Sequence, residues 1–173
     1  MAEFLEDVQR RAERLGLEAF CARHPDPFLV RLDERGGRDD ATPWVFAKPG
    51  AAKAPPGRLL QPVAGFMARV FEVVKTSGSG ARHVVALGRA ADNDIVIEER
   101  SISKAHARLK RTAAGEWEVE DAGSRNGTRV NGTRVALDTA RALRSGDVVN
   151  FGDVSCLFIS SRDLFEQLPT LTG

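Results

Sequence analysis

The sequence is poor in the residues that build disulfide frameworks, metal centres and membrane spans. Its 173 residues include two cysteines, Cys21 and Cys156, and three histidines. Two cysteines so far apart argue against the disulfide framework of a small secreted domain, and the cysteines and histidines show no metal-ligand spacing. No apolar run reaches the roughly 18 residues of a membrane-spanning helix. We therefore expect neither a metal site nor a transmembrane segment.

Net charge is also nearly absent. The 25 lysines and arginines balance 24 acidic residues, which leaves +1, so the chain as a whole has no field that would attract nucleic acid or a membrane surface. The N-terminus, MAEFLEDVQRR, has early acidic residues and lacks the apolar segment of a signal peptide. We expect a cytoplasmic protein whose partners are neither nucleic acids nor membranes.

The first part of the chain, residues 1–35, is predicted to hold a helix and a short strand. Apolar residues recur at three- and four-residue steps over residues 2–23, which is typical of one apolar helix stripe; its members are Phe4, Val8, Ala12, Leu15 and Ala19. Gly16 is a point at which this helix can break, and residues 28–32 form the predicted strand. The stripe has two interpretations: it packs on the rest of the protein, or it docks on a partner or a second copy. The sequence does not decide between them.

Beyond residues 36–62, a connector rich in Gly, Pro and Ala, the pattern changes to short strands. Over residues 63–160 these strands are separated by Gly, Asn and Asp turns, which predicts an all-β antiparallel β-sandwich with its loops gathered at the two ends. Trp117 alternates with glutamates along one strand, and we expect it in the core. Residues 161–173 are predicted to form a short helix and a tail.

Six short motifs lie in order along this strand-rich region. They are L-G-R, N-D-I-V-I, S-x-x-H-A, W-x-V-x-D, S-x-N-G-T-x-V-N-G and L-x-x-G-D-x-V-x-F-G. Together they resemble the forkhead-associated (FHA) domain, a bacterial-type single domain with an N-terminal extension, and the resemblance covers about residues 66–160. It implies an FHA/SMAD-like sandwich whose function is to bind phosphothreonine in partner proteins.

The residue types in these motifs suit a phosphate ligand. Phosphothreonine carries about −1.5 to −2 charges and three strong acceptor oxygens, so a binder needs fixed cations and short donors. Arg89 can meet phosphate as a bidentate fork, Ser103 has a hydroxyl donor and Lys104 is a point charge. Asn126 can clamp an extended peptide through its carbonyl and its amide nitrogen. By resemblance these four residues form the binding site. Arg125 stands where some family members carry a hydroxyl, and whether it meets phosphate or an acidic side chain of the peptide is open.

Four further residues are expected to support the site: Gly88, His106, Gly127 and Thr128. Gly88 allows a tight turn before Arg89, and by resemblance His106 braces the loop that presents Ser103. The same two residues could instead form a nucleophile–base pair, but a histidine that begins an alternating strand more often makes structural hydrogen bonds. We expect no catalytic residue and no cofactor.

The triplet Asn-Gly-Thr occurs twice, at residues 126–128 and 131–133. Both match the N-glycosylation sequon, which acts only in a secretory compartment. The first triplet belongs to the predicted recognition loop, where Gly127 permits the turn. The second is the predicted hairpin turn that follows a very short strand. Arg129 and Arg134 beside it are interpreted as solvated charges at a strand edge rather than as binding groups.

The resulting functional prediction is a non-enzymatic adaptor that binds threonine-phosphorylated proteins downstream of a Ser/Thr protein kinase. The alternative is an interaction or assembly module on the same fold that recognises an unphosphorylated surface. Thr170 and Thr172 in the tail are a third point of interest, because a phosphorylated tail could occupy the domain's own site.

Overall fold

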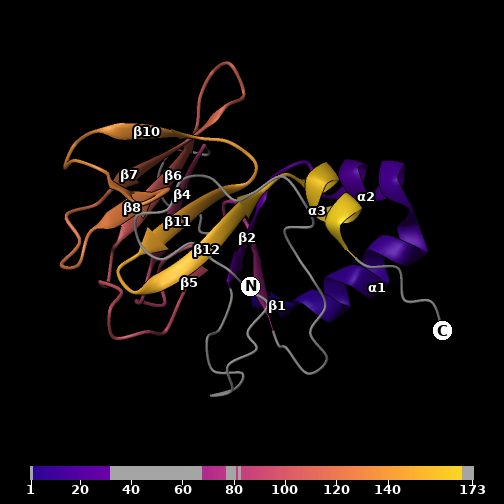
Figure 1. The fold of residues 1–173 in the computed structure, drawn as a ribbon, viewed down its shortest axis with the longest axis horizontal. Helices are drawn as coiled ribbons and strands as arrows, with labels where there is room; N and C mark the ends of the chain where they lie inside the picture. The colour runs from indigo at the N-terminus through magenta and orange to yellow at the C-terminus, as the bar shows by residue number, and fades with distance from the viewer. Residues whose placement is uncertain (1, 32–67, 77–80, 82, 169–173) are drawn as a thin grey trace.

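The computed structural model describes residues 2–31, 68–76, 81 and 83–168 (Figure 1). The predicted connector at 36–62 and the tail with Thr170 and Thr172 lie outside these residues. No helix in the described part is long and apolar enough to cross a membrane.

Two sheets form the body of the molecule (Figure 1). The seven-stranded sheet has the order β1 (Ala2–Phe4), β3 (Arg69–Glu72), β2 (Phe28–Arg31), β12 (Val154–Ile159), β11 (Asp147–Phe151), β8 (Thr128–Val130) and β9 (Thr133–Arg134). The five-stranded sheet has the order β10 (Ala140–Leu143), β7 (Trp117–Asp121), β6 (Ala107–Arg111), β4 (Val84–Gly88) and β5 (Ile95–Val96). This confirms the predicted β-sandwich. All pairs are antiparallel except β4 with β5, which run parallel.

The inward side chains of both sheets form one core, and turn chemistry connects its strands. Leu87 and Leu109 come from the five-stranded sheet, while Phe151 and Phe158 come from the seven-stranded one. The predicted hairpin turn at residues 152–153 is confirmed, since Phe151 pairs with Val154. Two expectations need correction. Trp117 is only partly buried against this core. Strand β10 was not predicted, because its Ala-Arg-Ala-Leu sequence has none of the β-branched or aromatic residues that favour strands.

Three helices gather on one side of the sandwich: α1 (Leu5–Leu15), α2 (Leu17–Arg23) and α3 (Ser161–Gln167) (Figure 1). The break that the sequence allowed at Gly16 is present, and this residue has a φ of 74°, which an amino acid with a side chain rarely adopts. The predicted helix start at residue 2 is wrong. Residues 2–4 form strand β1, which pairs with β3. Ser160 caps the N-terminus of α3, since its hydroxyl accepts a hydrogen bond from the Asp163 N–H at 3.1 Å.

The helices cover the outer face of strands β3, β2 and β12. In β2, Leu29 points into the sandwich core, whereas Phe28 and Val30 lie in a second cluster with Val8 of α1 and Phe20 of α2. These strands are therefore apolar on both faces. The packing interpretation of the N-terminal stripe is confirmed for Val8 and Ala12. It is wrong for Ala19, which is exposed, because the break at Gly16 turns the neighbouring Phe20 inward instead.

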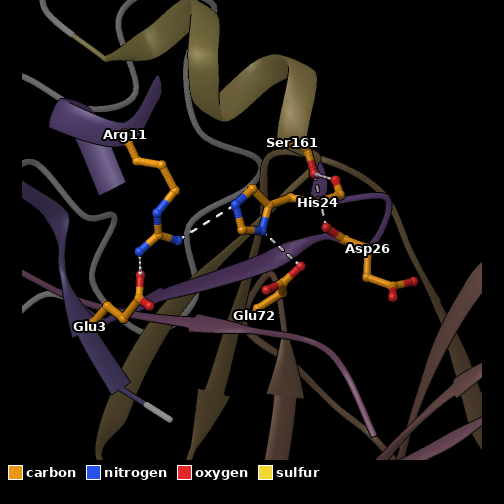
Figure 2. A network of polar contacts seen from close by, with 6 residues as sticks. All are labelled: Glu3, Arg11, His24, Asp26, Glu72 and Ser161. Carbon is orange, nitrogen blue, oxygen red and sulfur yellow. Dashed lines mark hydrogen bonds and ion pairs between the residues drawn. The ribbon is translucent and has the colours of Figure 1, made fainter. Parts of the chain in front are cut away.

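A polar network joins the helices to the sheet (Figure 2). Nδ1 of His24, just after α2, lies 3.0 Å from Oε1 of Glu72 at the end of β3. Nη2 of Arg11 donates to Glu3 at 2.8 Å, and its Nη1 lies 3.5 Å from Nε2 of His24. The Ser161 hydroxyl donates to the backbone carbonyls of His24 and Asp26. The segment between α2 and β2 is thus held from three sides, and β2 lies between β3 and β12. The division of the chain into an extension and a domain stays a prediction.

Candidate functional site

Three strand-connecting segments meet at one end of the sandwich: the first follows β4, the second precedes β6 and the third follows β7. Backbone hydrogen bonds join the first two. The N–H of Arg89, after β4, donates to the Ser103 carbonyl at 2.9 Å, and the N–H of Ala90 donates to the Lys104 carbonyl at 3.2 Å. Gly88 is needed for this contact, because a Cβ atom at that position would lie 2.1 Å from the Lys104 oxygen. The reason expected for Gly88 is therefore corrected: it permits a close approach of two backbones, and its φ is not positive.

The side chain of Arg89 is exposed and is held by one hydrogen bond within the described part of the chain. Its Nε donates to the Ile102 carbonyl at 3.2 Å. This bond sets the direction of the guanidinium group while leaving its two terminal nitrogens without a partner among the described residues. Those nitrogens are the pair of donors that a bidentate contact with phosphate uses.

The third segment joins the site through Ser103. The N–H of Arg125 donates to the Ser103 hydroxyl oxygen at 2.9 Å. A hydroxyl that accepts in this way still has its own hydrogen to donate. Lys104 and Arg125 are both exposed, and neither forms an ion pair within the ranges that the structure covers. The loop end thus has three cations and one free hydroxyl donor on segments that are bonded to one another.

Asn126 is also exposed and is anchored through one of its two functional groups. Its Nδ2 donates to the Ser101 carbonyl at 2.7 Å. The side-chain amide therefore retains one N–H and its carbonyl oxygen for a ligand. Ser101 is itself fixed, because its hydroxyl accepts from the Asp153 N–H at 3.3 Å. Gly152 lies so close that a Cβ there would be 2.5 Å from the Ser101 carbonyl oxygen.

His106 lies beneath these loops and is fully buried. Its Nδ1 accepts from the Ser103 backbone N–H at 3.1 Å, and its Nε2 lies 3.3 Å from the Gly127 carbonyl. One ring nitrogen must accept and the other must donate, which identifies a neutral ring with hydrogen on Nε2. Burial lowers the pKa of His106, although the bond to Gly127 and the charge of Asp121 act in the opposite direction. Both ring nitrogens are therefore engaged by backbone groups, and neither is available to the Ser103 hydroxyl as a base.

Asp121 organises the recognition loop, a role that the sequence interpretation missed. Its carboxylate accepts from the hydroxyls of Ser124 and Thr128, each at 2.7 Å, and from the N–H groups of Gly123 and Ser124 at 3.0 and 2.8 Å. Burial alone would raise the pKa of Asp121, but these four hydrogen bonds lower it. The Ser124 hydroxyl then accepts from the Gly127 N–H at 2.9 Å. Gly127, with a φ of 81°, makes the turn that was expected of it.

Asn93 is the second residue that the sequence interpretation missed. Its Nδ2 donates to the Ala90 and Lys104 carbonyls at 2.8 and 2.7 Å, so it holds together the two segments that carry Arg89 and Lys104. Both Asn93 and Asp121 stand inside the quoted motifs, N-D-I-V-I and W-x-V-x-D. Their position in these motifs was the signal that could have revealed them.

The part of the chain that the structure describes contains no candidate metal-binding site. No group of three or more His, Cys, Asp or Glu side chains there could hold a metal ion. What the described loops offer a ligand is cationic and hydrogen-bonding, which suits an anion.

Comparison with known proteins identifies relatives over this same region. The family model of the FHA domain matches residues 85–152. An oxoglutarate dehydrogenase inhibitor of Corynebacterium diphtheriae is 35% identical over 115 residues, which are 64% of this chain and 76% of that protein. An ABC transporter ATP-binding/permease protein of Mycobacterium tuberculosis is 38% identical over 120 residues, which are 67% of this chain and 13% of that protein.

The chain spans less than half the length of several curated relatives, the transporter among them. Among solved structures, Mycobacterium tuberculosis EmbR in complex with a low affinity phosphopeptide is 28% identical, with a TM-score of 0.42 over 46% of this chain and 20% of that chain.

Proposed function

The chain belongs to the family of FHA-domain proteins, and from this premise we propose that it is a non-enzymatic adaptor that binds phosphothreonine in a partner protein. The observation that carries the proposal is the set of three exposed cations, Arg89, Lys104 and Arg125, none of which has a carboxylate partner within the described ranges. Leaving charged donors without an internal partner costs little at an exposed site and keeps them available for an anion.

The proposed contacts follow from the donors that remain. The two terminal nitrogens of Arg89 would hold the phosphate as a fork. The Ser103 hydroxyl, which accepts from Arg125, would donate its hydrogen to a second phosphate oxygen. Lys104 and Arg125 would add charge. Asn126 would bind the peptide backbone through its free carbonyl oxygen and its remaining N–H.

The proposal of a binding protein rather than an enzyme is supported by the state of His106. Both of its ring nitrogens are occupied by backbone groups, and the ring is buried. It is therefore not positioned to take a proton from the Ser103 hydroxyl, which was the one candidate for nucleophilic chemistry. The corynebacterial relative is named as the inhibitor of an enzyme, which is a regulatory role.

The partner in this proposal is a protein phosphorylated on threonine by an upstream Ser/Thr protein kinase. Phosphoserine has the same charge, so preference for threonine would come from burial of its extra methyl group. That burial contributes roughly 1 kcal/mol, or about fivefold in affinity.

Calorimetry with three matched peptides tests the proposal. The peptides share one sequence and carry threonine, phosphoserine or phosphothreonine at one position. We expect the phosphothreonine peptide to bind most tightly and the unmodified peptide not to bind measurably. Equal affinity for the threonine and phosphothreonine peptides would favour the alternative, a phosphate-independent interaction module on the same fold.

A further inference from the structure

The second Asn-Gly-Thr triplet forms a rigid hairpin that fixes the place of Arg134. Asn131 and Gly132 have φ values of 50° and 80°, as a two-residue type I′ turn requires. The Asn131 side chain accepts from the Val148 N–H and donates to Asp147, each at 2.9 Å. The hairpin is thus tied to β11 as well as closed by its own turn, and β9 is held beside β8.

Arg134 is exposed on the edge strand β9, as predicted, and its guanidinium group also lies against the recognition loop. A Cβ atom at Gly127 would be 3.0 Å from Cζ of Arg134 and 3.0 and 3.1 Å from its Nη2 and Nε. The group therefore lies against the loop glycine that follows Asn126. Arg134 is thus the solvated strand-edge charge that the sequence indicated, and this contact places its charged group beside Asn126.

The two charged side chains that face each other across this hairpin are both cationic. Arg134 is directly opposite Arg129 in the β8–β9 pairing, and like charges facing each other across a strand pair are destabilising. Neither arginine forms an ion pair with another described residue, and the same is true of Arg125. The whole chain carries a net charge of only +1, so this concentration is a local feature.

Other cations of the molecule are neutralised within the fold. Ion pairs to carboxylates are formed by Arg11, Arg31, Lys75, Lys110 and Arg111. A carboxylate near Arg129 and Arg134 would have relieved their repulsion in the same way. No described carboxylate forms an ion pair with either arginine, which leaves a position that an anion from outside can occupy.

We propose that Arg134, supported by Arg129, forms a second anion-binding position beside the phosphothreonine position. It selects partners that carry an anionic group close to the phosphorylated threonine. That group is an Asp or Glu carboxylate or a second phosphate, since a guanidinium fork binds either. This inference rests on the proposed function, because it assigns a specificity to the same site.

The test uses the full chain and a set of phosphothreonine peptides with alanine at the flanking positions. In each further peptide one flanking alanine is replaced, either by aspartate or by phosphoserine. Affinities are measured by calorimetry for the unmodified protein and for the variants Arg134→Gln, Arg129→Gln and Arg162→Gln. Arg162 is an exposed arginine on α3, on the helical side of the molecule (Figure 1), and serves as a control for the loss of one charge.

We expect one flanking position at which an anionic group raises affinity for the unmodified protein by about three- to tenfold. Arg134→Gln should remove this gain while leaving affinity for the alanine-flanked peptide nearly unchanged. Arg129→Gln should reduce the gain by a smaller factor, and Arg162→Gln should preserve it. A larger gain from phosphoserine than from aspartate identifies a doubly phosphorylated partner, and equal gains identify an acidic one; both support the second position.

Three results would overturn the inference. In the first, Arg134→Gln leaves the gain from the anionic group intact. In the second, Arg134→Gln lowers affinity for the alanine-flanked peptide by the same factor as for the peptide with the anionic group. In the third, Arg162→Gln removes the gain as Arg134→Gln does. In all three the alanine-flanked phosphothreonine peptide still binds, so the proposed function survives. If that peptide does not bind the unmodified protein, the proposed function fails and this inference fails with it.

Discussion

The helical side of the molecule and its loop end use charged side chains differently. On the helical side these side chains are paired: Arg11 with Glu3, His24 with Glu72 and Arg111 with Asp26. At the loop end, Arg89 and Lys104 form no ion pair with any residue that the structure describes. Figure 2 shows the first arrangement, in which the polar groups face one another around the segment between α2 and β2. Most hydrogen bonds of the loop end instead involve a backbone group and fix the loops, while the cationic ends of Arg89 and Lys104 form no ion pair with a described residue.

The comparison separates two uses of polar side chains. Where partners lie within the fold, they join elements, and their removal should lower the free energy of unfolding. Where the charged ends have no internal partner, removal should leave stability nearly unchanged and should lower ligand affinity. Substitutions can therefore test whether a given side chain stabilises the fold or binds the ligand.

The largest effect is expected for Arg89→Ala. It should cost about 2–5 kcal/mol in phosphothreonine-peptide binding, by analogy with charge pairs at interfaces, with little change in stability because only the Nε bond to Ile102 is lost. Calorimetry and thermal unfolding of the same variant measure both quantities. Arg162→Ala is the matched control, and unchanged peptide affinity in Arg89→Ala would place the site elsewhere.

His24→Ala should show the reverse behaviour. The ring is buried, lies 4.9 Å from the Phe20 ring and 5.6 Å from the Phe28 ring between centroids, and contacts Glu72. Its loss leaves a cavity and a carboxylate without its partner, which should lower the free energy of unfolding by about 2–4 kcal/mol. Denaturant unfolding measures this change.

The exposed His83 supplies the control for His24→Ala, since His83→Ala should change stability by less than about 0.5 kcal/mol. Peptide affinity below the unfolding transition should be the same in both variants. A large loss of affinity in His24→Ala with normal stability would contradict the separation of the two regions.

Asn131→Ala and Asn126→Ala sharpen the comparison within a repeated triplet. Asn131 makes two side-chain hydrogen bonds and has a positive φ, so its replacement should cost about 1–2 kcal/mol of stability. Asn126 makes one bond, to Ser101, and its replacement should act chiefly on peptide affinity. Denaturant unfolding measures the stability of both variants, and calorimetry measures their peptide affinity. If Asn131→Ala lost binding while Asn126→Ala lost stability, the roles of the two loops would be reversed.

The smallest effect is expected from pH. Because burial lowers the pKa of His106 from its ordinary 6.5, the unfolded chain binds a proton near that pH that the folded protein does not. The contribution of His106 to stability is therefore complete above pH 6.5 and declines as pH falls below it. Asp121 acts at lower pH: its pKa is lowered from 3.8, so its contribution is present above 3.8 and is lost as pH falls through the folded value.

Unfolding measured across this pH range, together with an NMR titration of the His106 ring, checks the assignment. The folded ring should titrate below pH 6.5. A ring that gains its proton at or above 6.5 in the folded protein would contradict the neutral, hydrogen-bonded state.

Much of the fold could be predicted, because the signals were local. The hairpin at Asn131 and Gly132 was predicted from a dipeptide that tolerates positive φ, and the sandwich from short strands between turns. Ala19 was placed wrongly in the helix stripe, because a single conformational change at Gly16 shifts the apolar face by one residue. The cation-bearing loops were found through motif resemblance. Asp121 and Asn93 stand inside the same motifs but received no role, because a motif does not show which hydroxyl and backbone groups a side chain meets in the folded loop.

The sequence by itself determined the alternation of strands and turns, the break at Gly16 and the presence of a cationic loop set, since these depend on each residue's neighbours in the chain. Only the tertiary structure decided that β2 lies between β3 and β12, that Gly88 serves a backbone contact with Lys104, and that Arg134 lies on Gly127. These features depend on which distant segments pack together, and that is set by burial and hydrogen-bond pairing over the whole molecule.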